Sequence, residues 1–288
     1  MATIVRKDVP GAATDVAIVT GFSAEWLSLR EPADTRARDP NLSAQFVQRA
    51  RLHSPARFID LACGTGANLR YLAPRVGGDQ EWLLVDSDAT LLDEAARLES
   101  LRAIPGCRVR TQRLDLATEL RALELAPDLI ITASALLDLV SERWLTKLIG
   151  QCSANRCVAL FTLSYDGRIT FTPSDPDDEW IRDLVNLHQR GDKGFGAALG
   201  PSACQRTREL FVKADYQVSA ARSDWNLLPE ERLLQQSLLE GWSSAAMELA
   251  TNERDRCHRW LARRLAHLAT GASRIVVGHE DVLALPRD

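Results

Sequence analysis

The segment "FIDLACGTGANL", residues 58–69, is the feature that most constrains the fold of this chain. It joins an apolar run that predicts a buried strand, a turn that contains Gly64 and Gly66, and the start of a helical pattern. Glycine permits positive φ and the close approach of a ligand, and the first turn of a helix leaves N–H groups without partners. A nucleoside-bearing ligand suits such a turn. The spacing fits neither G-x-G-x-x-G nor a Walker sequence.

Acidic residues follow the predicted strands. Asp60 stands at the end of the first, Asp86 ends the second and Asp115 ends the third. The carboxyl ends of parallel strands form the ligand-binding edge of α/β folds. An acid at position 86 can accept hydrogen bonds from both hydroxyls of a ribose, and one at position 115 can hold an adenine amino group. The series predicts a nucleoside site at this edge.

From residue 57 onward, short β-branched or Leu-rich runs alternate with helical patterns, which is typical of a parallel sheet flanked by helices. Two helices broken at Pro32 and Pro40 are expected before residue 56, and a helix capped by Asp175 is expected up to Arg190. The other expected strands cover 56–62, 81–88, 107–115, 127–135, 156–165, 167–173 (a hairpin arm), 216–228 and 273–286, and the other expected helices include 67–76, 89–103, 229–249 and 252–269.

Residues 57–165 resemble a class I S-adenosylmethionine-dependent methyltransferase. The resemblance rests on "IDLACGTG", on "LLVDSD", on "RLD" at 113–115 and on "PDLIITASALLDLV" at the fourth predicted strand. It implies an α/β fold with a Rossmann-like seven-strand methyltransferase sheet. We expect an N-terminal helical cap over 1–55 and a methyltransferase domain over 56–288, with a two-helix insertion at about 229–270 before the last strand.

The resemblance also implies the cofactor S-adenosyl-L-methionine. Asp60 and the turn from Cys63 to Gly66 would hold its methionine portion, Asp86 its ribose and Ser134 its sulfonium end. The expected cofactor-binding residues are Asp60, Ala62, Cys63, Gly64, Thr65, Gly66, Asp86, Ser87, Asp115, Leu116 and Ser134. Ala62 stands where the family usually has its first glycine. The alternative is an NAD-binding Rossmann protein, whose fingerprint would need a third glycine.

Asp138, His188 and Lys193 are the candidate catalytic residues. Asp138 follows the fourth predicted strand, where relatives often place a polar residue that faces the methyl acceptor. A base is useful there if the acceptor must lose a proton. The alternative is that Asp138 caps the next helix. In the cap segment, Arg30, Arg36 or Arg38 can clamp a carboxylate through its bidentate fork, although solvated surface arginines are more common.

The segment "HQRGDKGFGAALGP", residues 188–201, contains four glycines. The helix dipole accounts for His188 and Arg190 as the end of a helix. A helix terminator needs only one glycine, so we interpret 192–200 as a candidate lid in which Phe195 and Lys193 close over the substrate. The alternative is a mobile connection.

The net charge of −4 gives no field that attracts a polyanion, and the six cysteines show no CxxC pairing. Neither a signal peptide nor a membrane span is apparent, so the cytoplasm is expected. The sequence predicts methyl transfer to a small-molecule acceptor that bears a carboxylate or phosphate, without a metal, nucleic acid or membrane partner. A regulatory protein that only binds the cofactor, and an RNA or protein methyltransferase, are the alternatives.

Overall fold

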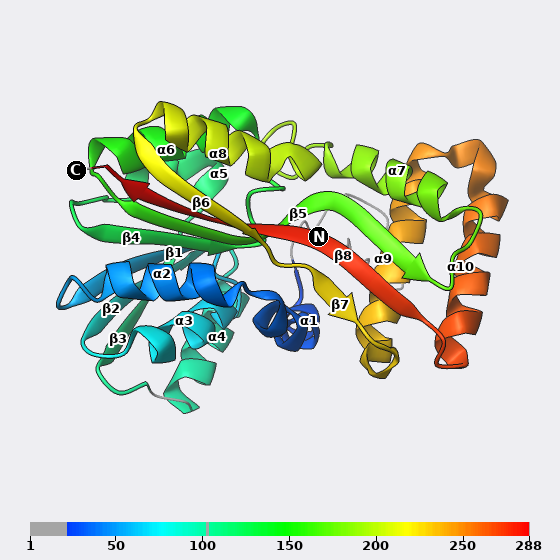
Figure 1. Cartoon of the computed structure of the whole chain (residues 1–288), viewed down its shortest axis with the longest axis horizontal. Coiled ribbons are helices and arrows are strands. Elements are labelled where there is room, and N and C mark those ends of the chain that lie inside the picture. The colour runs from blue at the N-terminus through cyan, green and yellow to red at the C-terminus, as the bar shows by residue number, and fades with distance from the viewer. Residues whose placement is uncertain (1–21, 102–103, 288) are drawn as a thin grey trace, which may run out of the picture.

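A mixed sheet forms the centre of the computed structural model, which describes residues 22–101 and 104–287 (Figure 1). Within these ranges the sheet has eight strands in the order β3-β2-β1-β4-β5-β8-β6, and β7 pairs with β8. The strands are β1 (Ala56–Leu61), β2 (Gln80–Asp86), β3 (Cys107–Arg113), β4 (Leu129–Ser134), β5 (Val158–Thr172), β6 (Tyr216–Arg222), β7 (Trp225–Leu227) and β8 (Arg274–Pro286). The first five strands pair with one another in parallel, which confirms the expected Rossmann-like α/β class, whereas β8 is antiparallel to β5.

Helices cover both faces of the parallel part of the sheet. One layer contains α2 (Pro40–Ala50), α3 (Ala67–Val76) and α4 (Ala89–Leu101), and the other contains α5 (Leu116–Glu119), α6 (Glu142–Ala154) and α8 (Ala203–Lys213). Their apolar residues form two buried clusters, one against each face, with Phe46, Phe58 and Leu72 in the first and Leu145, Phe161 and Phe211 in the second. The strands buried between these layers lie as the apolar runs predict.

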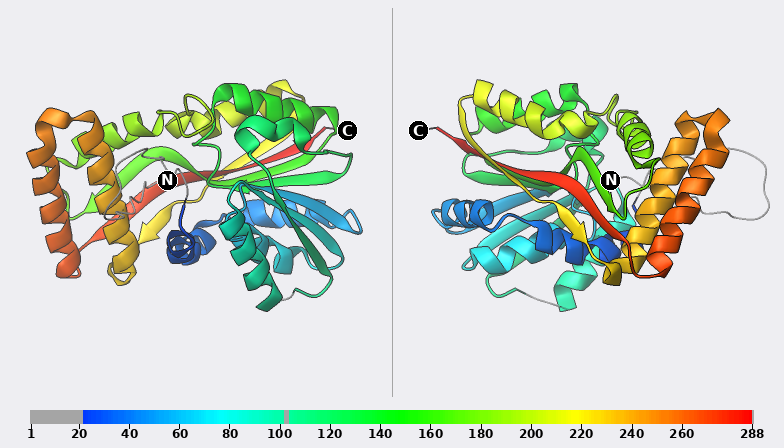
Figure 2. Two further views of the ribbon diagram at one scale, coloured as in Figure 1. Left: turned by 180° about the vertical axis from the view of Figure 1, so that it is seen from behind. Right: turned by 45° about the vertical axis from the view of Figure 1, so that its right-hand side comes forward.

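A third cluster lies beyond the parallel strands. There β5 and β8 continue as a long antiparallel pair, and α1 (Ala24–Ala37), α7 (Asp178–Gln189), α9 (Arg232–Leu249) and α10 (Arg254–Ala269) gather around this extension (Figure 2). The ring of Phe171 on β5 meets those of Trp242 and Trp260 edge-on at 5.6 and 5.9 Å. The helices α9 and α10 precede β8, where the two-helix insertion is expected.

Buried ion pairs fix α10 to the start of α7. The guanidinium of Arg264, which is fully buried, pairs with Asp178 and donates to the Pro173 carbonyl. Arg263 pairs with Asp175, whose carboxylate also accepts the N–H of Asp177. Because residues 175–177 form this turn, α7 begins at Asp178 and not directly after Asp175 as expected.

Three further details differ from the expected elements. The segment 167–173 continues β5 through a bulge and pairs with β8, so no hairpin arm forms. The stretch 216–228 makes two strands, β6 and β7, which raises the strand count of the described ranges from seven to eight. Pro32 lies inside α1, and the Arg30–Asp34 ion pair spans it and holds the helix together. No helix within 22–101 and 104–287 is long and apolar enough to cross a membrane.

Candidate active site

The turn after β1 bends through three residues with positive φ. Ala62, Gly64 and Gly66 have φ values of 49°, 53° and 79°, and Gly66 is the N-cap of α3. A Cβ atom on Gly64 would lie 2.9 Å from Cδ1 of Leu27, so α1 packs directly onto the turn. A side chain at position 64 would therefore strain the backbone and force the side chain of Leu27 to move.

A cavity lies between this turn, the end of β4 and α1. Its lining includes six of the eleven residues that the sequence predicts for cofactor binding, together with two charged residues of α1, Arg30 and Asp34. The six are Asp60, Ala62, Cys63, Gly64, Thr65 and Ser134. Segments that lie far apart in the sequence thus meet at one site, as the carboxyl edge of a parallel sheet requires.

Asp60 and Arg38 present unused hydrogen-bonding groups beside this cavity. Oδ1 of Asp60 accepts from Nδ2 of Asn68 at 2.7 Å and from Oγ1 of Thr132 at 2.8 Å, while Oδ2 has no partner among the described residues. Nη2 of Arg38 donates to Oδ1 of Asn68 at 3.1 Å and to Oγ of Ser134 at 3.3 Å, but its buried Nε and Nη1 have no described partner. A free carboxylate oxygen and free guanidinium donors fit the ammonium and carboxylate of a methionine moiety.

Burial raises the pKa of Asp60 to about 6, against hydrogen bonds from Asn68 and Thr132 that lower it. An ammonium group at Oδ2 would favour the ionised carboxylate and offset this desolvation. The residues present therefore fit an amino-acid portion of a cofactor.

The other predicted cofactor residues divide into two groups. The carboxylate of Asp86 accepts the N–H of Gly64 at 2.8 Å and that of Asp88 at 3.0 Å, so it holds the glycine turn, and burial raises its pKa. Ser87, Asp115 and Leu116 do not line the cavity. Asp115 is exposed and caps α5 through the N–H of Ala117, while Leu116 is buried.

Asp138 lies in the turn that follows β4. Its side chain is fully buried, and neither carboxylate oxygen has a hydrogen-bond partner within the described ranges. The helix-capping alternative is wrong, because Ser141 caps α6 by accepting the N–H of Trp144 at 3.3 Å. The backbone N–H of Gly200 donates to the Asp138 carbonyl at 3.0 Å, so the glycine-rich segment docks on this turn.

The glycine-rich segment is a folded loop. Oδ1 of Asp192 accepts the N–H groups of Gly194 at 2.7 Å and Gly196 at 3.0 Å, and both glycines have positive φ. The ring of Phe195 meets that of Trp144 edge-on at 5.4 Å and packs against the cluster under α6. Phe195 therefore packs against the protein core in this structure, its closure over a substrate stays a prediction, and Lys193 is the loop's candidate for a substrate contact.

The structure brings the three candidate catalytic residues into one neighbourhood. Nζ of Lys193 lies 3.4 Å from Nδ1 of His188, whose Nε2 lies 3.0 Å from Oε2 of Glu248 on α9. Burial lowers the pKa of Lys193, and the charges of Glu248 and Asp138 oppose that change. Glu248 was not found from the sequence, because nothing local distinguishes it from other acids on a helix.

His279 on β8 is a second residue that sequence reasoning missed. It pairs across strands with Tyr165 of β5, with ring centroids 6.3 Å apart, and lies 5.0 Å from the ring of Trp225. Its imidazole is buried and Nδ1 has no partner among the described residues. Burial, with help from the nearby charge of Arg30, lowers the pKa of His279 well below its usual value, so the ring is neutral at pH 7.

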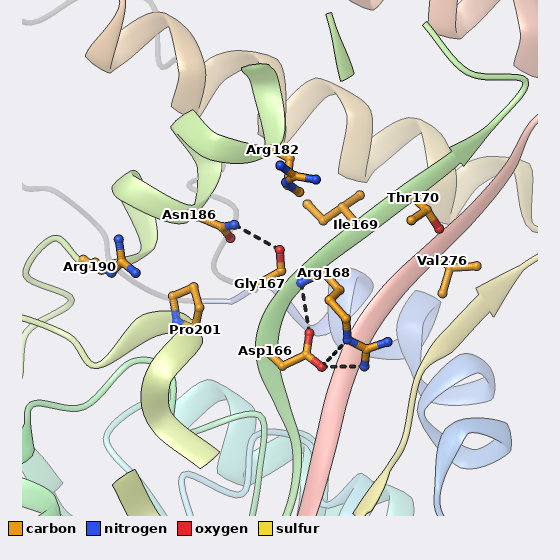
Figure 3. A pocket seen from close by; sticks show the side chains of 10 residues that line it. All are labelled: Asp166, Gly167, Arg168, Ile169, Thr170, Arg182, Asn186, Arg190, Pro201 and Val276. Carbon is orange, nitrogen blue, oxygen red and sulfur yellow. Dashed lines mark hydrogen bonds and ion pairs between the residues drawn. The ribbon is translucent and has the colours of Figure 1, made fainter. Parts of the chain in front are cut away.

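A larger cavity, of about 340 Å³, opens where α7 meets the bulge of β5 (Figure 3). Arg182 and Asn186 reach it from α7, and Asn186 donates to the Gly167 carbonyl at 3.0 Å. Arg168 is engaged by the carboxylates of Asp166 and Asp224. The glycine turn and Asp138 are not part of its lining, so this cavity is separate from the expected cofactor site.

Comparisons with known proteins agree with this geometry. Residues 58–155 match the family model described as a methyltransferase domain. Trans-aconitate 2-methyltransferase of Pseudomonas aeruginosa (strain UCBPP-PA14) is 27% identical over 194 residues, which span 61% of this chain and 61% of that protein. The match thus leaves more than a third of the relative's length uncovered.

Two solved structures share the fold. A cyclopropane-fatty-acyl-phospholipid synthase-like protein from Lactobacillus casei ATCC 334 superposes with a TM-score of 0.55 at 13% identity, covering 91% of this chain and 94% of that one. The YcgJ protein from Bacillus subtilis has a TM-score of 0.50 at 11% identity, covering 87% and 100%. The strand order and the glycine turn define a methyltransferase-type α/β fold. Over residues 58–155 this chain is similar to the methyltransferase domain, and it resembles the class I S-adenosylmethionine-dependent methyltransferases, whose cofactor is S-adenosylmethionine.

Proposed function

We propose that this protein transfers a methyl group from S-adenosylmethionine to a small-molecule acceptor. The observation that carries the proposal is the buried carboxylate of Asp138, without a described partner, in the turn after β4 and four residues beyond Ser134 of the cofactor cavity. A buried carboxylate without partners is costly unless a ligand supplies the donor. Its place beside the end of β4 supports contact with an acceptor.

The residues that would hold the cofactor follow from the geometry. Oδ2 of Asp60 would accept from the ammonium of the methionine portion, and the free Nε and Nη1 of Arg38 would donate to its carboxylate. The glycine turn would let the ligand approach the backbone, and Asp86 would serve the ribose. Ser87, Asp115 and Leu116 remain proposed for the ribose and adenine, supported by their place after β2 and β3.

When bound, S-adenosylmethionine supplies a methyl group activated by a sulfonium charge. Methyl transfer neutralises that charge, so the protein contributes in-line placement and exclusion of water. Asp138 would orient the acceptor and take its proton where it has one to lose. Lys193, aligned by His188 and Glu248, would hold an anionic group of the acceptor, a carboxylate or phosphate.

We place this activity in the cytoplasm. The six cysteines are free thiols, and five of them are buried. Disulfides form mainly in oxidising compartments, so free thiols support a reducing one.

Two measurements test the function. Calorimetry with S-adenosylhomocysteine at about 100 μM should show binding, since this concentration reveals dissociation constants in the micromolar range. Labelled S-adenosylmethionine should then transfer its methyl group to a small molecule in a panel of carboxylates, phosphates, amines and alcohols. Failure to bind the cofactor product would refute the proposal. Binding with no turnover on the panel or on metabolite extracts would favour a regulatory role.

A further inference from the structure

Two buried hydrogen-bond acceptors on the substrate side lack donors. These are the carboxylate of Asp138, with both oxygens free, and Nδ1 of His279. Both side chains are at most 1% exposed. Buried acceptors in folded proteins almost always have a partner, so a partner from outside the described chain is expected at each.

Three donors near His279 are committed elsewhere. The hydroxyl of Tyr165 donates to Oδ1 of Asn186 at 2.7 Å, and Nε1 of Trp225 donates to Oδ1 of Asp34 at 3.0 Å. The guanidinium of Arg30 is held by both oxygens of Asp34, at 2.9 and 3.1 Å. These contacts leave Nδ1 of His279 for a ligand.

The same contacts connect His279 to the cofactor cavity. Arg30 and Asp34 line that cavity, and both contact Trp225, whose ring lies 5.0 Å from His279. Tyr165 links the other side, since its ring lies 6.3 Å from His279 and its hydroxyl is within reach of the Asp138 charge. Tyr165 thus lies near both His279 and Asp138, which are not themselves among the residues that line the cavity.

We propose that the reacting atom of the acceptor is a hydroxyl oxygen or an amine nitrogen that carries a hydrogen, and not a carboxylate. This proposal rests on the proposed methyl transfer. Asp138 receives the hydrogen of the reacting atom, and Nδ1 of His279 accepts a hydrogen bond from a second donor on the same molecule. A carboxylate at the reacting position would meet the carboxylate of Asp138 in a buried site, where like charges repel strongly. An anionic group remains acceptable at Lys193, away from the reacting atom.

The transfer step balances without a further reactant. The lone pair of the acceptor oxygen or nitrogen forms the new bond to the methyl carbon, and the carbon–sulfur bond breaks with its electron pair left on sulfur. The proton of the acceptor passes to the Asp138 carboxylate. His279 keeps its proton count, and its neutral ring fits this role because the cations Arg30 and Arg168 surround it, with Asp34 and Asp224 as their counter-charges.

The chemistry of the product tests the inference even while the acceptor is unidentified. The full chain is incubated with S-adenosylmethionine labelled in its methyl group and a deproteinised metabolite extract, and the labelled small molecules are treated with mild alkali. Methyl esters release volatile methanol, whereas methyl ethers and N-methyl groups are stable. We expect alkali-stable label. Volatile label, or turnover of trans-aconitate to an ester, would overturn the inference. Transfer to no fraction, despite binding of S-adenosylhomocysteine, would contradict the proposed function itself.

Variants of His279 provide a second test of the inference. They are assayed with the extract fraction that accepts the labelled methyl group. His279→Phe removes the acceptor nitrogen and should raise the apparent KM by about tenfold, with kcat changed by less than about threefold. His279→Gln restores a hydrogen-bond acceptor and should recover most of the loss. His258→Phe on the exposed side of α10 is the matched control. An unchanged KM in a folded His279→Phe variant, or no recovery with Gln, would exclude this role for His279.

Discussion

Arg70 of α3 forms a two-point ion pair with Glu31 of α1, with Nε–Oε1 at 2.8 Å and Nη2–Oε2 at 2.6 Å. The same guanidinium donates through Nη1 to the Thr65 carbonyl in the glycine turn, at 2.5 Å. One side chain therefore joins the cofactor turn to the helix that covers it. Access to the cavity depends on α1, because Leu27 of that helix already contacts the turn.

Glu31→Ala should weaken the attachment of α1 to the glycine turn. We expect S-adenosylhomocysteine to dissociate about three to ten times faster, because one partly buried ion pair no longer holds α1, while the global stability changes by less than about 1 kcal/mol. Stopped-flow displacement measures the rate. Glu81→Ala breaks a more exposed pair with Arg108 on the sheet and serves as the control. Equal dissociation rates for the two variants would show that the Glu31 contact does not restrain the ligand.

Gly64→Ala should abolish tight cofactor binding. A methyl group at φ 53° is strained and would lie 2.9 Å from Cδ1 of Leu27, so the turn and the Leu27 side chain beside the cavity must rearrange. Gly77→Ala is the matched control, since Gly77 has φ 63° but nothing within 4 Å of the added atom. Both variants should lose about 1–2 kcal/mol of stability, whereas only Gly64→Ala should lose more than about tenfold in affinity by calorimetry. Parallel affinity losses in the two variants would contradict this explanation.

Cofactor affinity should depend on pH through Asp60, whose pKa is raised to about 6 by burial. The ionised carboxylate binds an ammonium group, so affinity for S-adenosylhomocysteine should rise from pH 5 to pH 7 and level off above. The stability of the ligand-free protein should depend on pH in the opposite direction. The folded state holds the proton more tightly than the unfolded state, so ionisation of Asp60 lowers stability as the pH rises from about 4 to 6. In Asp60→Asn, both the affinity and the stability should depend less on pH. If the affinity of this variant still changes steeply between pH 5 and pH 7, another group is responsible for the titration.

The conformation of the glycine turn could be predicted because its residues are neighbours in sequence. Asp60 to Gly66 fold as one strand, turn and helix, and their chemistry is local. Arg38 and His279 could not be assigned in this way, because their roles depend on which distant segments the sheet brings together. Arg38 resembled any surface arginine until α1 and α2 placed it against Asn68 and Ser134. His279 was one residue of an apolar strand, and only the antiparallel return of β8 beside β5 sets it next to Tyr165.

Arg264→Ala should be among the most destabilising substitutions in the helical extension. Removing this buried guanidinium leaves the Pro173 carbonyl without its side-chain donor and takes the counter-charge from the Asp178 carboxylate, which keeps, among the described residues, only the N–H donors of Trp260 and Asp175. We expect a loss of about 3–5 kcal/mol, as for other broken buried pairs. Thermal unfolding measures the change, with Arg259→Ala on the exposed side of α10 as the control. A melting temperature equal to that of the control would mean that the Arg264 contacts do not stabilise the association of α7 with α10.

Lys193→Ala should weaken binding of the acceptor and leave binding of the cofactor unchanged. Lys193 lies beside His188 and within reach of the Asp138 charge, whereas the cofactor cavity is lined by other residues. We expect the apparent KM for an anionic acceptor to rise by about tenfold or more, since a charge-assisted contact is lost, and the affinity for S-adenosylhomocysteine to remain within about twofold. Lys213→Ala, at the exposed end of α8, provides the control. Glu248→Gln should show a smaller effect in the same direction, because Glu248 contacts His188 and acts on Lys193 only through its charge and through that histidine. An unchanged KM in the Lys193→Ala enzyme would contradict the proposal that Lys193 binds an anionic group of the acceptor.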